Sequence, residues 1–289
     1  MSEKKRVVID TDTAFGCPGR DVDDGLALFL ALNSPELQVE AITITYGNVN
    51  MKRALRSARE ILSFLHREEI PVYPGATSRH QLGKPTEAAR ALIARLSHDP
   101  EHISLLAIGP LTNIATVEKI QPGLLRLLRE VVIMGGAVYR RGIIPPAFKA
   151  EFNFWCDPHA AKTVLNSGAN IFLFPLDVTY KVVFGKKEMQ KLHSSRSTDG
   201  KYLWKNLISW YLMNKLATRA GGFHPHDPTA AAYLIAPELF RLEELSIDVT
   251  TSGLRKGKVS ITPDSAQVKV ALDIDSAQFL NLLIDRILR

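Results

Sequence analysis

Five aspartates lie in and directly after the first strand-like segment, and they constrain the fold more than any other feature of the chain. The segment VVID ends in Asp10, and Asp12, Asp21, Asp23 and Asp24 follow in a turn that contains Gly and Pro. Carboxylates crowded in this way repel one another, so a fold tolerates them only with a positive charge among them. A divalent cation with oxygen ligands is the simplest such charge. Because ligands of open α/β sheets bind at the carboxyl ends of the strands, this turn predicts a metal-assisted site there.

Strand-like and helix-like segments alternate along the first half of the chain. Apolar strands are expected at 6–10, 37–45, 103–108, 130–134 and 170–174, and helices at 23–32, 52–66, from 110, and 158–166. The second half predicts helices at 187–193, 202–218, 229–235 and 276–288, and β-rich stretches at 245–251 and 268–274. Apolar strands that alternate with helices are typical of a parallel sheet covered on both faces. We therefore expect an α/β fold with a mostly parallel, Rossmann-like sheet, helices on both faces, helical insertions and a small C-terminal β-rich segment. A single domain is expected over residues 1–289.

The composition excludes several classes of protein. The net charge is +6, but the cationic runs (Lys4 to Arg6, Arg140-Arg141, Lys186-Lys187 and Arg255-Lys256) are short and predict solvated surface, not a nucleic-acid footprint. No apolar run reaches the roughly 18 residues that a membrane-spanning helix needs. The first residues show no signal-peptide pattern, and two cysteines are too few for a disulfide framework. We expect a cytoplasmic protein without a nucleic-acid or membrane partner.

Three further polar clusters follow apolar segments, and each has an ordinary structural interpretation. Asn48 follows ITITY and could be a turn residue. Glu151 and Asn153 lie in AEFN, where Glu151 could be a surface carboxylate. His226 and Asp227 precede a helix-like segment, which Asp227 could cap.

The clusters predict more when they are taken together with the first turn. Asp10, Asp12, Asp24 and Asp227 could supply hard oxygen ligands for Ca²⁺ or Mg²⁺. The amide and carboxylate side chains at 48, 151 and 153 offer donors and acceptors for sugar hydroxyls. His226 is the residue type for general acid catalysis near neutral pH. A carboxylate beside a metal-bound water is an arrangement that generates a nucleophile.

These motifs resemble the inosine–uridine-type nucleoside hydrolases, whose N-terminal signature is DxDxGxDD after a strand. The resemblance continues through TYGNVN, GPLTNIA, VVIMGGAV, AEFN, CDPHAAKTVL, PLDVT and HDPTAAAYLIAPELF, and so covers nearly the whole chain. It implies Ca²⁺-dependent hydrolysis of the N-glycosidic bond of ribonucleosides, through an oxocarbenium-like transition state, to free nucleobase and ribose. It also implies a homodimer or homotetramer.

The resemblance implies a role for each matching residue. One Ca²⁺ per subunit would be held by three carboxylates and the backbone carbonyl that precedes GPLTNIA: Asp12, Asp24, Asp227 and Ile108. Asp23 would take a proton from the metal-bound water, and Asp10 would lie behind it. The ribose hydroxyls would be bound by Asn48, Glu151 and Asn153. His226 would protonate the leaving base.

The chain departs from the family pattern at several places, among them the segment after VYPGA, which lacks the HG-containing segment of pyrimidine-preferring members. Ten residues, TAFGCPGRDV, separate Asp12 from Asp23 where the common motif has three, so the metal site requires this insertion to bulge outward. Asp21 within it is either a solvated loop carboxylate or an added contact to ligand or metal. Pro145 stands where an Asn for the ribose 5′-hydroxyl is usual, and Tyr180 where a His is common. The base pocket would draw on aromatic residues among Phe15, Tyr139, Phe148, Tyr180, Tyr202, Trp204, Tyr211 and Phe223.

Two other classes of function stay open. VVIDTDT also fits the first motif of haloacid-dehalogenase-like phosphohydrolases, in which Asp10 would be the nucleophile, Asp12 an acid/base and Mg²⁺ the cofactor. That interpretation leaves AEFN and HDP unexplained. The altered first turn also allows a ribose- or nucleoside-binding protein that has lost catalysis.

Overall fold

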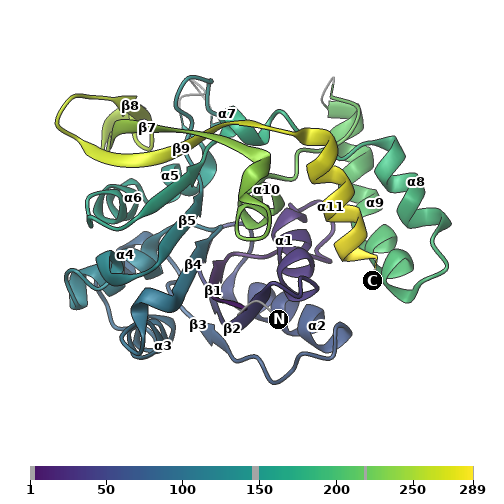
Figure 1. Cartoon of the computed structure of the whole chain (residues 1–289), viewed down its shortest axis with the longest axis horizontal. Coiled ribbons are helices and arrows are strands. Elements are labelled where there is room, and N and C mark those ends of the chain that lie inside the picture. The colour runs from purple at the N-terminus through teal and green to yellow at the C-terminus, as the bar shows by residue number, and fades with distance from the viewer. Residues whose placement is uncertain (1–3, 145–149, 218–219, 289) are drawn as a thin grey trace.

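The computed structural model describes residues 4–144, 150–217 and 220–288, and its strands form one nine-stranded sheet (Figure 1). The strand order is β3-β2-β1-β4-β5-β6-β9-β7-β8. The strands are β1 (Lys5–Thr11), β2 (Leu37–Ile44), β3 (Val72–Pro74), β4 (Ile103–Ala107), β5 (Glu130–Met134), β6 (Ile171–Phe174), β7 (Phe240–Val249), β8 (Val259–Ile261) and β9 (Ala266–Ile274). Strands β1 to β6 and β9 pair in parallel, whereas β7 is antiparallel to β8 and β9. The predicted mostly parallel sheet with a C-terminal β-rich segment is therefore confirmed.

Helices cover both faces of this sheet, each set over its own apolar core (Figure 1). One face carries α1 (Asp23–Leu32), α2 (Met51–Phe64), α10 (His226–Tyr233) and α11 (Ser276–Ile287). The other carries α3 (Glu87–Leu96), α4 (Thr112–Ile120) and α6 (Pro158–Leu165). The short helices α5 (Phe152–Cys156) and α7 (Leu176–Thr179) follow β5 and β6, and the predicted helical insertion is α8 (Lys186–Ser194) with α9 (Thr198–Ala217). In the described part of the chain, no helix is long and apolar enough to cross a membrane.

The path of the chain creates a crevice at the carboxyl ends of β1 and β4. The chain runs outward from β1 to β2 and β3, and then returns to β4 on the other side of β1. Such a reversal of strand order is the point at which open α/β sheets bind ligands. Asp10 and Asp12 lie at the end of β1, and Ile108 directly follows β4. The topology alone therefore brings the first turn and the GPLTNIA segment together.

Several element boundaries differ from the expectations. Helix α10 begins at His226 and not at 229, so Asp227 lies within its first turn, and no side-chain hydrogen bond caps this helix. The predicted capping role of Asp227 is therefore wrong. Helix α3 was not expected, although Thr86 caps it by accepting a hydrogen bond from the Ala89 N–H at 3.2 Å. The three-residue strands β3 and β8 were also missed, because such short segments carry no periodicity.

Candidate active site

The residues singled out from the sequence gather at this crevice. A cleft of about 270 Å³ is lined by eight of the ten predicted residues: Asp12, Asp23, Asn48, Ile108, Glu151, Asn153, His226 and Asp227. The other two, Asp10 and Asp24, are fully buried and do not line it. A wider groove of about 1030 Å³, beside Lys4 and Arg6, contains none of the ten.

Three carboxylates come close enough to share one cation. One oxygen from each of Asp23, Asp24 and Asp227 lies within 4.8 Å of the other two. Asp23 and Asp24 open α1, and Asp227 lies in the first turn of α10. These helices pack against each other, and the small side chains of Ala230 to Ala232, all fully buried, allow a close approach. Helix packing thus brings together carboxylates that are about 200 residues apart, at helix N-termini that favour negative charge.

Asp12 lies beside this trio and has one oxygen without a partner. Its Oδ2 accepts a hydrogen bond from the Asn48 N–H at 2.6 Å, whereas its Oδ1 is buried and has no hydrogen-bond partner among the described residues. Gly47 permits this contact, because a Cβ at this position would lie 1.8 Å from Asp12 Oδ2. A buried oxygen without a partner is costly, and a cation with oxygen ligands would supply the missing contact. The residues present therefore fit a divalent cation.

Without a cation the negative charges of this cluster are strongly disfavoured. Burial raises the pKa of Asp12, Asp23 and Asp227 well above the ordinary range, and repulsion from neighbouring carboxylates adds to the effect. Burial also raises the pKa of Asp24 to about 7. A positive ion would restore the charged forms by direct attraction. The acidic cluster can therefore bind a metal ion.

Asp10 is held behind the cleft by side chains of neighbouring strands. Its Oδ2 accepts hydrogen bonds from Thr43 Oγ1 at 2.5 Å and Asn113 Nδ2 at 2.8 Å. Burial raises its pKa to about 7. Because Asp10 does not line the cleft, it is not placed to attack a substrate there. This position argues against the nucleophilic role that a phosphohydrolase would require.

Glu151 is buried and not a surface carboxylate, so that interpretation is wrong. It caps α5 by accepting hydrogen bonds from the backbone N–H groups of Asn153 at 2.7 Å, Gly136 at 2.9 Å and Phe154 at 3.1 Å. Burial nevertheless raises its pKa to about 7. These backbone donors fix the orientation of the carboxylate, which lines the cleft.

The two asparagines of the cleft are also oriented by hydrogen bonds. Asn48 Nδ2 donates to Asp24 Oδ2 at 3.1 Å. Asn153 Nδ2 donates to the carbonyl oxygens of Ile108 at 3.2 Å and Met134 at 3.3 Å. Asn48 therefore ties the loop after β2 to the start of α1, and Asn153 ties the start of α5 to the ends of β4 and β5.

His226 lies in the cleft beside α7. Its Nδ1 is 2.7 Å from Thr179 Oγ1, and its ring centroid is 5.2 Å from that of Tyr180. Burial, with a smaller effect from His224, lowers the pKa of His226 to about 3. The sequence predicted His226 as a general acid near neutral pH, and this role stays a prediction. This shift favours the neutral imidazole, which can act as a hydrogen-bond donor through one N–H.

The ten-residue insertion is anchored and does not simply bulge outward. Phe15 is buried, with its ring centroid 5.8 Å from that of Phe29 and 6.0 Å from that of Tyr202. Residues 16–20 remain largely at the surface. Asp21 lines the cleft, and its Oδ1 accepts hydrogen bonds from the Val22 N–H at 2.7 Å and the Asp23 N–H at 3.3 Å. Asp21 is therefore part of the turn into α1 and not a freely solvated carboxylate.

The apolar wall of the cleft was not anticipated. It includes Trp210, Phe152 and Leu176, none of which was among the aromatic candidates for the base pocket. Two of the predicted positions, Pro145 and Phe148, lie outside the described residues. The sequence of α9 does not show that Trp210 lines the cleft and its neighbours do not, because this depends on where α9 packs. The polar residues that hold Asp10 and His226 lie in ITITY, GPLTNIA and PLDVT. Because these motifs already match the family, they could have pointed to these residues.

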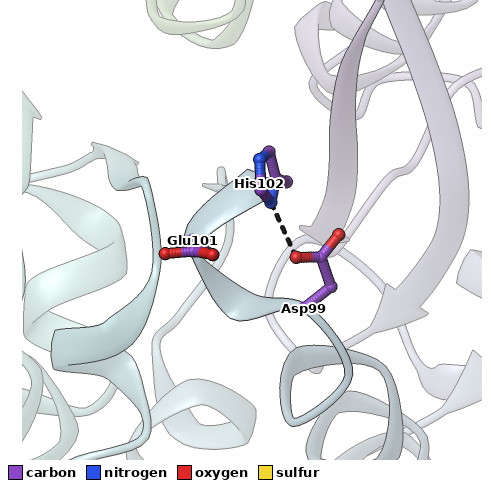
Figure 2. A group of neighbouring side chains, drawn as sticks. All are labelled: Asp99, Glu101 and His102. Atoms are coloured by element: carbon purple, nitrogen blue, oxygen red, sulfur yellow. Dashed lines mark hydrogen bonds and ion pairs between the residues drawn. The ribbon is translucent and has the colours of Figure 1, made fainter.

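A second group of metal-ligating residue types lies at the surface (Figure 2). Asp99 Oδ1 is 2.6 Å from His102 Nδ1, and Asp99 Oδ2 is 2.7 Å from Arg6 Nη1. One ligand atom of Glu101 lies within 4.8 Å of both, although Figure 2 shows no hydrogen bond or ion pair from Glu101 to this pair. Because all three members are exposed and Asp99 is paired with a cation, the group is a surface ion-pair network.

Comparisons with known proteins agree with this geometry. The family described as inosine-uridine preferring nucleoside hydrolase matches residues 7–281. Probable uridine nucleosidase 2 of Arabidopsis thaliana is 30% identical, over 100% of this chain and 99% of its own. A solved plant nucleoside hydrolase superimposes with a TM-score of 0.90 at 29% identity, over 99% of both chains. A purine-preferring ribonucleoside hydrolase from Gardnerella vaginalis does so with a TM-score of 0.88 at 27% identity, over 98% of both chains.

Fold, cleft and relatives together define a hydrolase of N-glycosidic bonds. The chain belongs to the inosine-uridine preferring nucleoside hydrolase family. Members of this family hydrolyse ribonucleosides, so the interpretation as a haloacid-dehalogenase-like phosphohydrolase is not supported.

Proposed function

We propose that this protein hydrolyses ribonucleosides to free nucleobase and ribose with Ca²⁺ as its cofactor. The buried, unpartnered Oδ1 of Asp12 beside the carboxylate trio is the observation that carries this proposal. Asp12, Asp24, Asp227 and the carbonyl oxygen of Ile108 would hold one cation per subunit. When bound, Ca²⁺ would orient the ribose hydroxyls and the attacking water and would weakly acidify that water. A site built mainly of protein oxygens favours Ca²⁺ over Mg²⁺, which usually keeps several waters.

Asp23 is proposed as the general base. Its Oδ1 accepts a hydrogen bond from the Asp24 N–H at 3.1 Å and its Oδ2 from the Asp227 N–H at 3.2 Å, so its orientation is fixed. It would take a proton from the water as the C1′–N bond breaks and positive charge builds on the ribose ring. The surrounding carboxylates would stabilise that charge electrostatically. A positioned base of this kind contributes a factor of roughly 10² to 10⁴ in rate.

Asn48, Glu151 and Asn153 are proposed to bind the ribose hydroxyls. All three line the cleft, and the hydrogen bonds described above hold each of them in one orientation. Glu151 offers carboxylate oxygens, which accept hydrogen bonds from hydroxyl donors. Fixed partners of this kind reduce the orientational cost of the reaction.

His226 is proposed to assist the leaving nucleobase as a neutral imidazole. If the Thr179 hydroxyl donates to Nδ1, then Nε2 carries the hydrogen and can donate to the base as negative charge develops on it. The proton that leaves the water is balanced by the proton that the released base finally carries. Thr179 thus acts as a positioning residue that selects the tautomer of His226.

The substrate class is proposed to be ribonucleosides with a planar purine or pyrimidine base. Trp210, Phe152 and Leu176 provide an apolar wall that suits a flat ring. The relatives described above are named for uridine in one case and for purines in another, so no single base is favoured.

The organisation of the protein is proposed on separate grounds. One continuous sheet with a core on each face supports a single domain over residues 1–289. The homodimer or homotetramer and the cytoplasmic location remain predictions from the sequence.

Release of reducing sugar from inosine, uridine, cytidine, adenosine and guanosine tests the proposal, with Ca²⁺ and with chelator. We expect chelator-sensitive ribose release and its loss in Asp23→Asn. Saturable nucleoside binding without release of free base would instead favour the binding protein that has lost catalysis. Turnover of p-nitrophenyl phosphate without ribose release would support the interpretation as a phosphohydrolase.

A further inference from the structure

A second cavity, of about 480 Å³, lies beyond the C-terminal end of α5 and shares no lining residue with the cleft. Three segments that are far apart in the sequence form it: the turn at 79–82, the start of α6 and the connection from β7 to β8. They bring together four nitrogen-bearing side chains, Arg79, His80, His159 and Lys256. We call this cavity the cationic pocket.

Lys256 is held in place in this pocket, whereas Arg79 lies exposed at its edge. Lys256 Nζ lies 4.1 Å from the ring centroid of Trp155, a cation–π contact that fixes the side chain. The turn that carries it is tight, because a Cβ on Gly257 would lie 2.7 Å from the Cα of Trp155. Burial lowers the pKa of Lys256, and the nearby charge of Arg79 lowers it further. Arg255-Lys256 was expected to be solvated surface, and for Lys256 the structure shows a packed position instead.

These charges are not neutralised by the protein. Among the residues that the structure describes, neither Arg79 nor Lys256 forms an ion pair. Asp157 also lines the pocket, but its Oδ1 accepts from the Ala160 N–H at 3.0 Å and its Oδ2 from Thr112 Oγ1 at 2.6 Å. Arg79 and Lys256 against the one carboxylate of Asp157 leave a net positive charge. An anion in the pocket would relieve the repulsion between the two cations.

We propose that the cationic pocket binds a phosphate group, as inorganic phosphate or as part of a phosphomonoester. A phosphate monoester carries a charge of about −1.5 to −2 at pH 7, which is opposite in sign to the net charge of the pocket. The guanidinium of Arg79 supplies several donors in a geometry suited to phosphate oxygens. The hydroxyls of Thr251 and Ser252 lie on the same cavity and add neutral donors. The volume exceeds that of one phosphate, so the organic part of an ester also fits.

The test is a calorimetric titration of the calcium-loaded protein, with calcium equimolar to protein so that calcium phosphate does not precipitate. Inorganic phosphate is the first probe, and phenyl phosphate is the second because it has no ribose to occupy the cleft. Arg79→Ala removes one cation, and Lys256→Met removes the other while keeping an unbranched side chain on Trp155. Arg255→Ala is the matched control, because this neighbouring cation does not line the pocket.

We expect one saturable phosphate site per chain, weakened about tenfold or more in Arg79→Ala and in Lys256→Met and unchanged in Arg255→Ala. Tighter binding of phenyl phosphate would identify an ester as the ligand, and equal or weaker binding would identify free phosphate. The proposal is overturned if wild type shows no saturable binding, if all three variants bind like wild type, or if Arg255→Ala weakens binding as much as the others. Ribonucleoside hydrolysis by Arg79→Ala should match wild type, so this outcome is independent of the proposed hydrolase function.

Discussion

Gly47→Ala isolates the contribution of Asp12 to cation binding. A Cβ at position 47 would lie 1.8 Å from Asp12 Oδ2 and 2.7 Å from Asp12 Cγ, so the carboxylate must move. It then loses the 2.6 Å hydrogen bond from the Asn48 N–H. A hydrogen bond to a charged group contributes about 1.5–3 kcal/mol. Since about 1.4 kcal/mol corresponds to a tenfold change in affinity, we expect Ca²⁺ to bind roughly 10- to 150-fold more weakly.

Calorimetric titration of chelator-treated protein with Ca²⁺ measures this change directly. Gly185→Ala is the matched control, because its Cβ would meet only ordinary contacts, the nearest at 3.6 Å. Urea unfolding of both variants without metal checks that each is folded. If folded Gly47→Ala binds Ca²⁺ within twofold of wild type, Asp12 does not hold the cation. The carboxylates of Asp23, Asp24 and Asp227 would then be sufficient.

Three further predictions follow from the burial of particular groups. Burial raises the pKa of Asp24 and Glu151 to about 7, so between about pH 5 and 7 the folded metal-free protein binds more protons than the unfolded chain. Its free energy of unfolding, from urea titrations, should therefore rise as the pH falls from 8 to 5, and saturating Ca²⁺ should suppress this rise. Thr179→Val leaves the buried Nδ1 of His226 without its partner, which should lower kcat for ribonucleosides about 5- to 150-fold, whereas Thr179→Ser should retain activity. Phe15→Ala empties a buried aromatic site and should lower the free energy of unfolding by about 3–5 kcal/mol, measured in urea.

Each of these predictions has a result that contradicts it. Stability that falls steadily from pH 8 to 5 in chelator would mean that the carboxylates are already charged without metal. Equal losses of kcat on inosine and on p-nitrophenyl riboside, whose leaving group needs no donor, would show that Thr179 does not act through His226. An unchanged unfolding midpoint for Phe15→Ala would mean that the insertion is not anchored through this ring.

Local patterns predicted most of the parallel sheet and its helices. Apolar segments such as 103–108 and 130–134 have the length and composition of buried strands, and these are local properties. The start of α10 was placed wrongly, because the Asp227 N–H donates to Asp23 Oδ2, a contact from the far end of the sequence. The missed strands β3 and β8 are held by neighbouring strands, and a segment of three residues cannot show such pairing by itself.

The sequence by itself determined which functional residues this protein has, namely the aspartates after the first strand and the AEFN and HDP clusters. It also determined the family that these residues indicate. Tertiary structure decided which of these groups can act together. Packing of α1 on α10 placed Asp23, Asp24 and Asp227 around one position, and burial lowered the pKa of His226. The position of α9 placed Trp210 on the cleft. Distance and dielectric environment control these properties, and both are set by residues that are remote in the sequence.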